Sequence, residues 1–108
     1  MSNNYRLEFA LPAMSEFIDI FEYISLDLDN PKAASDLMDA FDEAFSNICL
    51  FPRSAPEMEE TISGVRVRKL IVKNYVAFYH VLEEQGIVRV VYIRYAPRDL
   101  RELFDEKK

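Results

Sequence analysis

The sequence predicts one α+β domain, residues 1–108, in which a helical hairpin packs on a mostly antiparallel sheet. The expected order is β-α-α-β-β-β with a short C-terminal helix. Apolar residues recur at helical spacing through the first half, and beyond Gly64 the spacing changes to that of strands. Half of the 108 residues are hydrophobic, which suffices for one core, whereas the chain is too short for two domains.

The N-terminal half predicts a strand and two helices. Residues 5–11, YRLEFAL, form a strand candidate, and an amphipathic helix is expected over residues 12–30. Asn30 is a favourable N-cap and Pro31 suits the first helical position, so a second helix should follow. Residues 53–64, RSAPEMEETISG, read as a polar loop. The residues expected to pack the helices on the sheet are Phe17, Phe21, Ile24, Leu37, Phe41 and Phe45.

The C-terminal half predicts a three-stranded antiparallel meander followed by a short helix after Pro97. The strand candidates VRVRKLIV, VAFYHVL and IVRVVYIRY are rich in β-branched and aromatic residues, and the turn-like sequences KN and EEQG separate them. Side chains alternate between the two faces of a strand, so Arg66 and Arg68 should share a face and Lys69 should take the other. The same rule predicts that Val88, Val90, Tyr92 and Arg94 share a face, alternating with Arg89, Val91, Ile93 and Tyr95. The cross-strand register is left open.

The charge is divided unequally along the chain, whose overall formal charge is −6. Residues 1–62 hold 13 acidic and 3 basic residues, a net charge of −10, whereas residues 63–108 hold 10 basic and 6 acidic residues, a net charge of +4. An anionic partner should therefore meet the second part. No leader or membrane span is recognisable, which predicts a cytoplasmic protein. The single cysteine, Cys49, is expected in the core, and neither a metal site nor a phosphate-binding glycine loop is predicted, so no cofactor is expected.

The end of the last strand, YIRYAPRDL, holds the main functional candidates. Arg94, Tyr95 and Arg98 stand where the strand ends, and loops anchored on a rigid sheet are where function tends to lie. Arg66 and Arg68 could grip an anion or could instead protect an edge strand from further pairing.

The order of the motifs resembles that of toxins of the RelE/ParE superfamily of bacterial type II toxin–antitoxin modules. The resemblance covers almost the whole chain, from YRLEFA and FIDIFEYI through NPKAASDLMDAFDEAF and LFPRSAPE to GVRVRKLIVKNYVAFYH and VRVVYIRYAPRD. It implies a growth-inhibiting toxin that a cognate antitoxin neutralises. RelE-like members cut messenger RNA in the ribosome, whereas ParE-like members poison DNA gyrase.

The resemblance can be followed at five positions that RelE-like ribonucleases use. Lys69 and Arg98 match the cations of those enzymes on the first meander strand and after the last strand. Val67 stands where they carry a second lysine, Val76 where they carry an arginine, and Phe104 where they carry a terminal tyrosine. Phenylalanine cannot exchange a proton, and the only histidine, His80, lies in mid-strand among apolar neighbours.

These departures favour a ParE-like gyrase poison. One alternative is a ribosome-dependent endoribonuclease, in which the cations stabilise charge, and another is an inactive module that only binds its antitoxin. The candidates for target contact or charge stabilisation are Arg68, Lys69, Arg94 and Arg98, with Arg66 and Tyr95 as binding residues. The sequence leaves open the target, the identity of the antitoxin and the oligomeric state.

Overall fold

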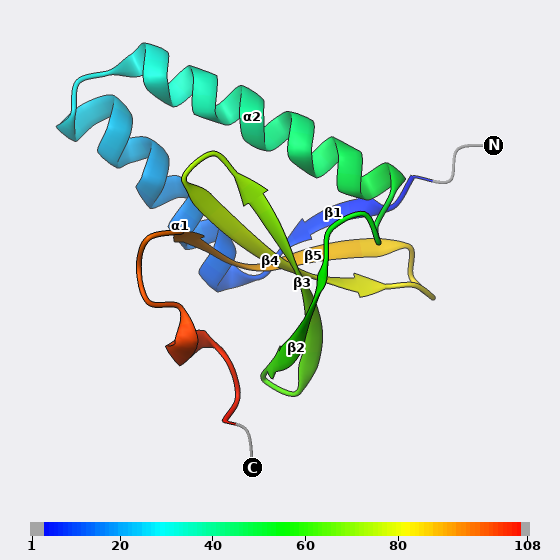
Figure 1. The fold of residues 1–108 in the computed structure, drawn as a ribbon. Helices are drawn as coiled ribbons and strands as arrows, with labels where there is room; N and C mark the ends of the chain where they lie inside the picture. The colour runs from blue at the N-terminus through cyan, green and yellow to red at the C-terminus, as the bar shows by residue number, and fades with distance from the viewer. Residues whose placement is uncertain (1–3, 107–108) are drawn as a thin grey trace.

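The computed structural model describes residues 4–106 and places five strands in one sheet, with both long helices on one of its faces (Figure 1). The strand order is β1-β5-β4-β3-β2, in which β1 runs parallel to β5 and the other neighbours are antiparallel. This confirms the predicted α+β class and element order. The elements are β1 (Arg6–Phe9), α1 (Leu11–Glu22), η1 (Tyr23–Asp27), α2 (Pro31–Leu50), β2 (Glu57–Ile62), β3 (Val65–Val72), β4 (Tyr75–Leu82), β5 (Ile87–Tyr95) and η2 (Arg101–Leu103).

The helical hairpin joins the core as predicted. Asn30 accepts a hydrogen bond from the Ala33 backbone N–H at 3.1 Å, which caps α2. Residues on both helices pack with β1, β3, β4 and β5 in one hydrophobic cluster, and the six residues expected at this contact all belong to it.

The first helix departs from the prediction in its last turn. The expected α-helix over residues 12–30 is correct as far as Glu22, after which Tyr23–Asp27 forms a π-helix. The Leu28 N–H donates to the Tyr23 carbonyl at 3.0 Å, and the Ser25 hydroxyl donates to the Phe21 carbonyl at 2.6 Å. A serine hydroxyl that bonds back to the preceding turn competes with the helical ladder, which accounts for the widened turn.

The segment predicted as a polar loop contains the edge strand β2, so that prediction is wrong. Glu57 pairs opposite Arg68 and Ile62 opposite Val65, with an irregularity between them. Ile62 is buried and Met58 packs beside it, while Glu57 and Glu59 remain exposed. Acidic side chains on an edge strand discourage pairing with a further strand. Because they are abundant here, the segment resembled a polar loop in the sequence.

A β-bulge in β5 reverses the expected alternation. Phe78 pairs with Tyr92 but Tyr79 pairs with Val90, which leaves Val91 as an extra residue. Before the bulge, Val88 and Val90 face the helices. After it Ile93 joins them, and Tyr92 faces the opposite side. The prediction that Val88 and Arg94 share a face is therefore wrong.

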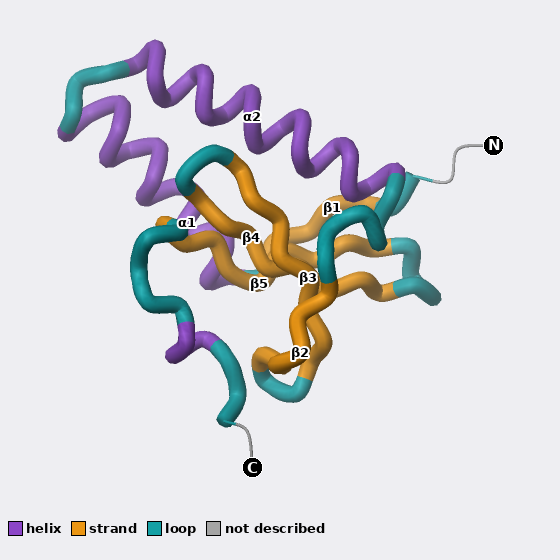
Figure 2. Tube along the Cα trace, in the orientation of Figure 1, coloured by secondary structure: helices purple, strands orange, loops and turns teal. Residues whose placement is uncertain are grey.

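The sheet face opposite the helices, here called the open face, carries a second hydrophobic cluster. Its buried members are Ile62, Val67, Val76 and Phe78. The C-terminal segment, residues 96–106, crosses this side of the sheet (Figure 2) and packs Leu100, Leu103 and Phe104 on the cluster. The predicted C-terminal helix is one 3-10 turn, η2.

Candidate functional site

The free edge of β5 is completed by a side chain from α1. β1 accompanies β5 only as far as the pair Phe9 and Val90. Beyond that point the carboxylate of Glu16 accepts a 2.8 Å hydrogen bond from the Ile93 N–H through Oε1. Its Oε2 accepts a hydrogen bond from Nε of Arg94, with which it also forms a salt bridge. Glu16 thus accepts the hydrogen bond that a neighbouring strand would otherwise accept from the Ile93 N–H, and it binds the Nε side of the Arg94 guanidinium.

Arg94 is held on a second side by an aromatic ring. Its guanidinium carbon lies 5.0 Å from the centroid of the Tyr92 ring, a cation–π contact. The side chains of Arg94 and Glu16 are 28% and 20% exposed, so water screens their ion pair only in part. Within residues 4–106 the Nη1 and Nη2 groups of Arg94 have no hydrogen-bond partner, and these four N–H donors are available to a ligand.

Lys69 and Arg98 are two further candidate cations of this site. Lys69 pairs with Phe78, which in turn pairs with Tyr92, so Lys69 and Tyr92 flank Phe78 in one row on the open face. Arg98 is exposed just beyond the end of β5, where its backbone N–H donates to the Tyr95 carbonyl at 3.1 Å. Neither side chain forms a salt bridge with any residue that the structure describes. Lys69, Arg94 and Arg98 are here called the cation set.

Arg66 and Arg68 are not part of the cation set, because their guanidinium groups donate to backbone carbonyls. Arg66 donates to the carbonyls of Met58 and Glu59 at 3.1 and 3.0 Å. Arg68, only 18% exposed, donates to the carbonyl of Ala55 at 2.7 Å, and its Nη2 lies 3.9 Å from the Glu57 carboxylate. Arg66 therefore fixes β2 itself, and Arg68 fixes the segment that leads into it.

Tyr95 lies apart from the cation set, towards the helices. Its ring packs on Tyr75 at a centroid distance of 5.7 Å, with an interplanar angle of 64°. Burial raises the pKa of Tyr75, and the neighbouring Tyr95 and Tyr23 raise it further. Tyr95 is still 43% exposed. Arg94 and Tyr95 are adjacent in sequence but belong to opposite sides of β5.

Two titratable side chains outside the cation set, His80 and Asp99, are engaged within the chain. His80 is half-buried, and its Nδ1 donates to the Arg66 carbonyl oxygen at 3.0 Å. Asp99 is bound by Arg101, whose side chain and backbone N–H hold the pKa of that carboxyl at about 2. Val67, Val76 and Phe104 all belong to the cluster on the open face, where Val67 and Val76 are fully buried.

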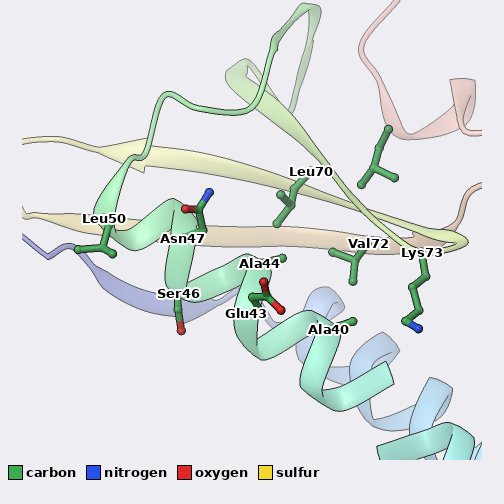
Figure 3. Close-up of a pocket in the computed structure, with 10 residues that line it drawn as sticks. Ala40, Glu43, Ala44, Ser46, Asn47, Leu50, Leu70, Val72 and Lys73 are labelled. Atoms are coloured by element: carbon green, nitrogen blue, oxygen red, sulfur yellow. The ribbon is translucent and has the colours of Figure 1, made fainter. Parts of the chain in front are cut away.

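A separate hollow lies between α2 and β3. This open groove has a volume of about 570 Å³ and is lined by Ala40, Ala44, Leu70 and Val72, with Glu43 and Lys73 also on its walls (Figure 3). Cys49 lies half-buried near the end of α2, and burial raises the pKa of its thiol. No three metal-ligating side chains come together among residues 4–106. None of the described helices is long and apolar enough to cross a bilayer.

Glu16 is the site residue that the sequence did not reveal. In the sequence it is one of several acids spaced along an amphipathic helix, which is the pattern of a solvated face. Its role depends on where β1 stops pairing with β5, and no local motif records that point.

Comparison with known proteins finds one matching family and several similar structures. Residues 7–100 match the family described as "ParE toxin of type II toxin-antitoxin system, parDE". A chain of the chromosomal ParDE system from P. aeruginosa superposes with a TM-score of 0.65 at 16% identity, over 87% of this chain and 98% of that one. A chain of the intact E. coli RelBE complex superposes with a TM-score of 0.58 at 20% identity, and the match covers 87% of this chain and 99% of that one. A chain of the archaeal RelE–RelB complex from Pyrococcus horikoshii OT3 superposes with a TM-score of 0.59 at 14% identity, and the match covers 92% of this chain and 100% of that one. A search of curated protein sequences finds no significant match. At these identities the structural likeness establishes the fold.

Proposed function

The chain belongs to the ParE toxin family of type II toxin–antitoxin systems, and we propose that it arrests growth by binding DNA gyrase without cutting RNA. One observation carries the choice against RNA cleavage. Val67, Val76 and Phe104 stand where the RelE resemblance implies a lysine, an arginine and a tyrosine, and all three belong to the same hydrophobic cluster.

With apolar residues at these three positions, the site lacks side chains on which RelE-like RNA cleavage depends. Cleavage through the 2′-hydroxyl needs a base, an acid and stabilisation of the charged intermediate. Lys69 and Arg98 supply charge, but arginine is too basic to exchange protons near neutral pH, and His80 is engaged with a backbone carbonyl. A toxin that only binds its target, and breaks no bond in it, needs a surface of complementary charge and shape but no proton-transfer group.

The cation set is the proposed contact surface for the target. Within residues 4–106 no backbone carbonyl accepts a hydrogen bond from the side chains of Lys69, Arg94 or Arg98, whereas Arg66 and Arg68 hold β2 and the segment before it in place. Tyr95 is retained as a binding candidate at the strand end because its ring is 43% exposed.

A cognate antitoxin is the proposed partner that masks this surface. The structural relatives include toxins solved together with their antitoxins, as in the RelBE and RelE–RelB complexes. The +4 charge of residues 63–108 suits an antitoxin segment rich in acidic residues. Raised salt should slow its association more than it speeds its release, because exposed charges act mainly on encounter.

Two assays with the purified protein separate the possible activities. We expect inhibition of DNA supercoiling by gyrase, with no ribosome-dependent cleavage of messenger RNA in a translation mixture. Arg98→Ala should weaken the inhibition, whereas Lys32→Ala, which removes an exposed cation from the acidic half, should not. Ribosome-dependent cuts in the messenger would establish the ribonuclease instead. A protein active in neither assay that still binds its antitoxin would be a binding module only.

A further inference from the structure

We propose that Glu16 is a positioning residue that holds Arg94 ready to bind an oxyanion of the target on the open face of the sheet. The inference rests on the proposed function in one respect, since the cation set is taken as the target-contacting surface. The ligand chemistry is that of phosphate and carboxylate, which both present two oxygens side by side to a guanidinium group.

Three contacts fix the orientation of the guanidinium. Its Nε edge donates to the Glu16 carboxylate, and its plane lies over the ring of Tyr92. The other oxygen of the same carboxylate accepts the Ile93 N–H at 2.8 Å, so the carboxylate is itself tied to the backbone of β5. The remaining donors, Nη1 and Nη2, form the edge of the fork that can bind two oxygens at once.

The neighbouring charges favour an anion at that edge. Lys69 belongs to the row of Phe78 and Tyr92, and Arg94 pairs with Val76 in the adjoining row of the ladder. Within residues 4–106 neither Lys69 nor Arg98 is paired with a carboxylate, and the one acid bound to Arg94 occupies only its Nε edge. Lys69 and Arg94 thus stand on the same face of the sheet, on the two strands that flank β4.

Two opposite effects compete when Glu16 is changed to glutamine. The change removes a negative charge beside the site, which by itself would strengthen the binding of an anion. It also releases Arg94, because an amide that still accepts the Ile93 N–H turns its donor group towards Nε. Restricting a flexible side chain in its binding conformation is typically worth a factor of about 3 to 10 in affinity. The partly exposed position of Glu16 weakens the charge effect, and the loss of orientation therefore dominates.

The test is an NMR titration of the purified protein with inorganic phosphate and, separately, with acetate, at constant ionic strength. In the wild type the Nε–H signal of Arg94 should be resolved and should shift on addition of the anion. Glu16→Gln should broaden that signal and raise the phosphate Kd about 3- to 10-fold. The matched control is Glu22→Gln, which makes the same chemical change at an exposed position of α1 and should leave the Kd unchanged. Because phosphate carries more negative charge than acetate at neutral pH, we expect it to bind more tightly.

A double-mutant cycle distinguishes positioning from general support of the fold. If Glu16 acts through Arg94, then Glu16→Gln has no further effect on phosphate binding when Arg94 is already alanine. A lower melting temperature with an unchanged Kd would make Glu16 merely structural. Unchanged or tighter binding in Glu16→Gln would overturn the proposal, as would a wild-type protein that binds neither anion. A wild type that binds phosphate but does not inhibit gyrase would refute the proposed function alone.

Discussion

Phe41 is the residue at which removal of a single side chain should cost the fold most. It lies in α2, is fully buried, and stands between the two helices and the sheet. Its ring lies 5.4 Å from that of Phe17, 5.5 Å from that of Phe45 and 6.1 Å from that of Tyr75, measured between centroids. The Phe41→Ala variant therefore removes contacts from three elements at once.

The expected cost follows from transfer and cavity terms. Returning a buried phenylalanine side chain to water costs roughly 1.5–3 kcal/mol, and the unfilled cavity adds to it, so that Phe→Ala changes cost about 3–5 kcal/mol. A domain of this size has a total free energy of unfolding of about 5–15 kcal/mol. With a urea dependence of about 2 kcal/mol per molar, the midpoint should fall by roughly 1.5–2.5 M.

Urea unfolding followed by circular dichroism at the helical band measures this change. The matched control is Phe51→Ala, because Phe51 is 61% exposed just after α2 and its loss should change the free energy of unfolding by no more than about 0.5 kcal/mol. A Phe41→Ala cost below about 1.5 kcal/mol, or one equal to that of Phe51→Ala, would show that the aromatic cluster does not hold the hairpin on the sheet.

Two further predictions concern charged residues. Asp105 accepts hydrogen bonds from Thr61 and from the backbone of the β2–β3 turn, which lower its pKa below 3.8. The ionised Asp105 should stabilise the fold fully at pH values above the pKa that Asp105 has in the unfolded chain. This stabilisation should vanish as the pH falls through the lower pKa that Asp105 has in the folded protein. Acid unfolding curves of Asp105→Asn and wild type should therefore differ near neutral pH and converge in acid. Arg68→Ala should cost about 1–3 kcal/mol in urea unfolding because it leaves the buried Ala55 carbonyl unpaired, whereas Arg98→Ala should stay within about 0.5 kcal/mol. Equal costs for the two arginines would contradict the division between structural and functional cations.

The helices could be predicted from sequence because their signals are local. The spacing of Phe17 and Phe21 in α1 and of Leu37 and Phe41 in α2, with Asn30 as the cap, lies within one element each. The edge strand β2 was missed because three of its six residues are glutamates, which strand propensities disfavour. Its pairing with β3 comes from Met58 and Ile62 reaching the cluster on the open face, a contact with residues distant in sequence.

The candidate site was predicted in part, for the same physical reason. Lys69, Arg94 and Arg98 could be named from a basic strand end, and among residues 4–106 none of their side chains donates to a backbone carbonyl. Arg66 and Arg68 have the same residue type and strand context, yet the carbonyl groups that bind them belong to the segment before and within β2, which was expected to be a loop. Because β2 was not recognised, the carbonyl groups that bind these two side chains could not be predicted either.

The bulge at Val91 shows how one extra residue decides what the cation set can bind. Without it, strict alternation would have kept Val90, Tyr92 and Arg94 on the face that the helices cover. With it, Tyr92 moves to the open face beside Phe78, and Arg94 can lie over the Tyr92 ring while its Nε reaches Glu16 around the unpaired edge of β5. Ile93 fills the core position that Tyr92 would have occupied. The bulge therefore leaves a hydrophobic side chain buried beneath the helices. The sequence names Arg94 as a candidate, and the bulge places its side chain where Glu16 and Tyr92 both contact it.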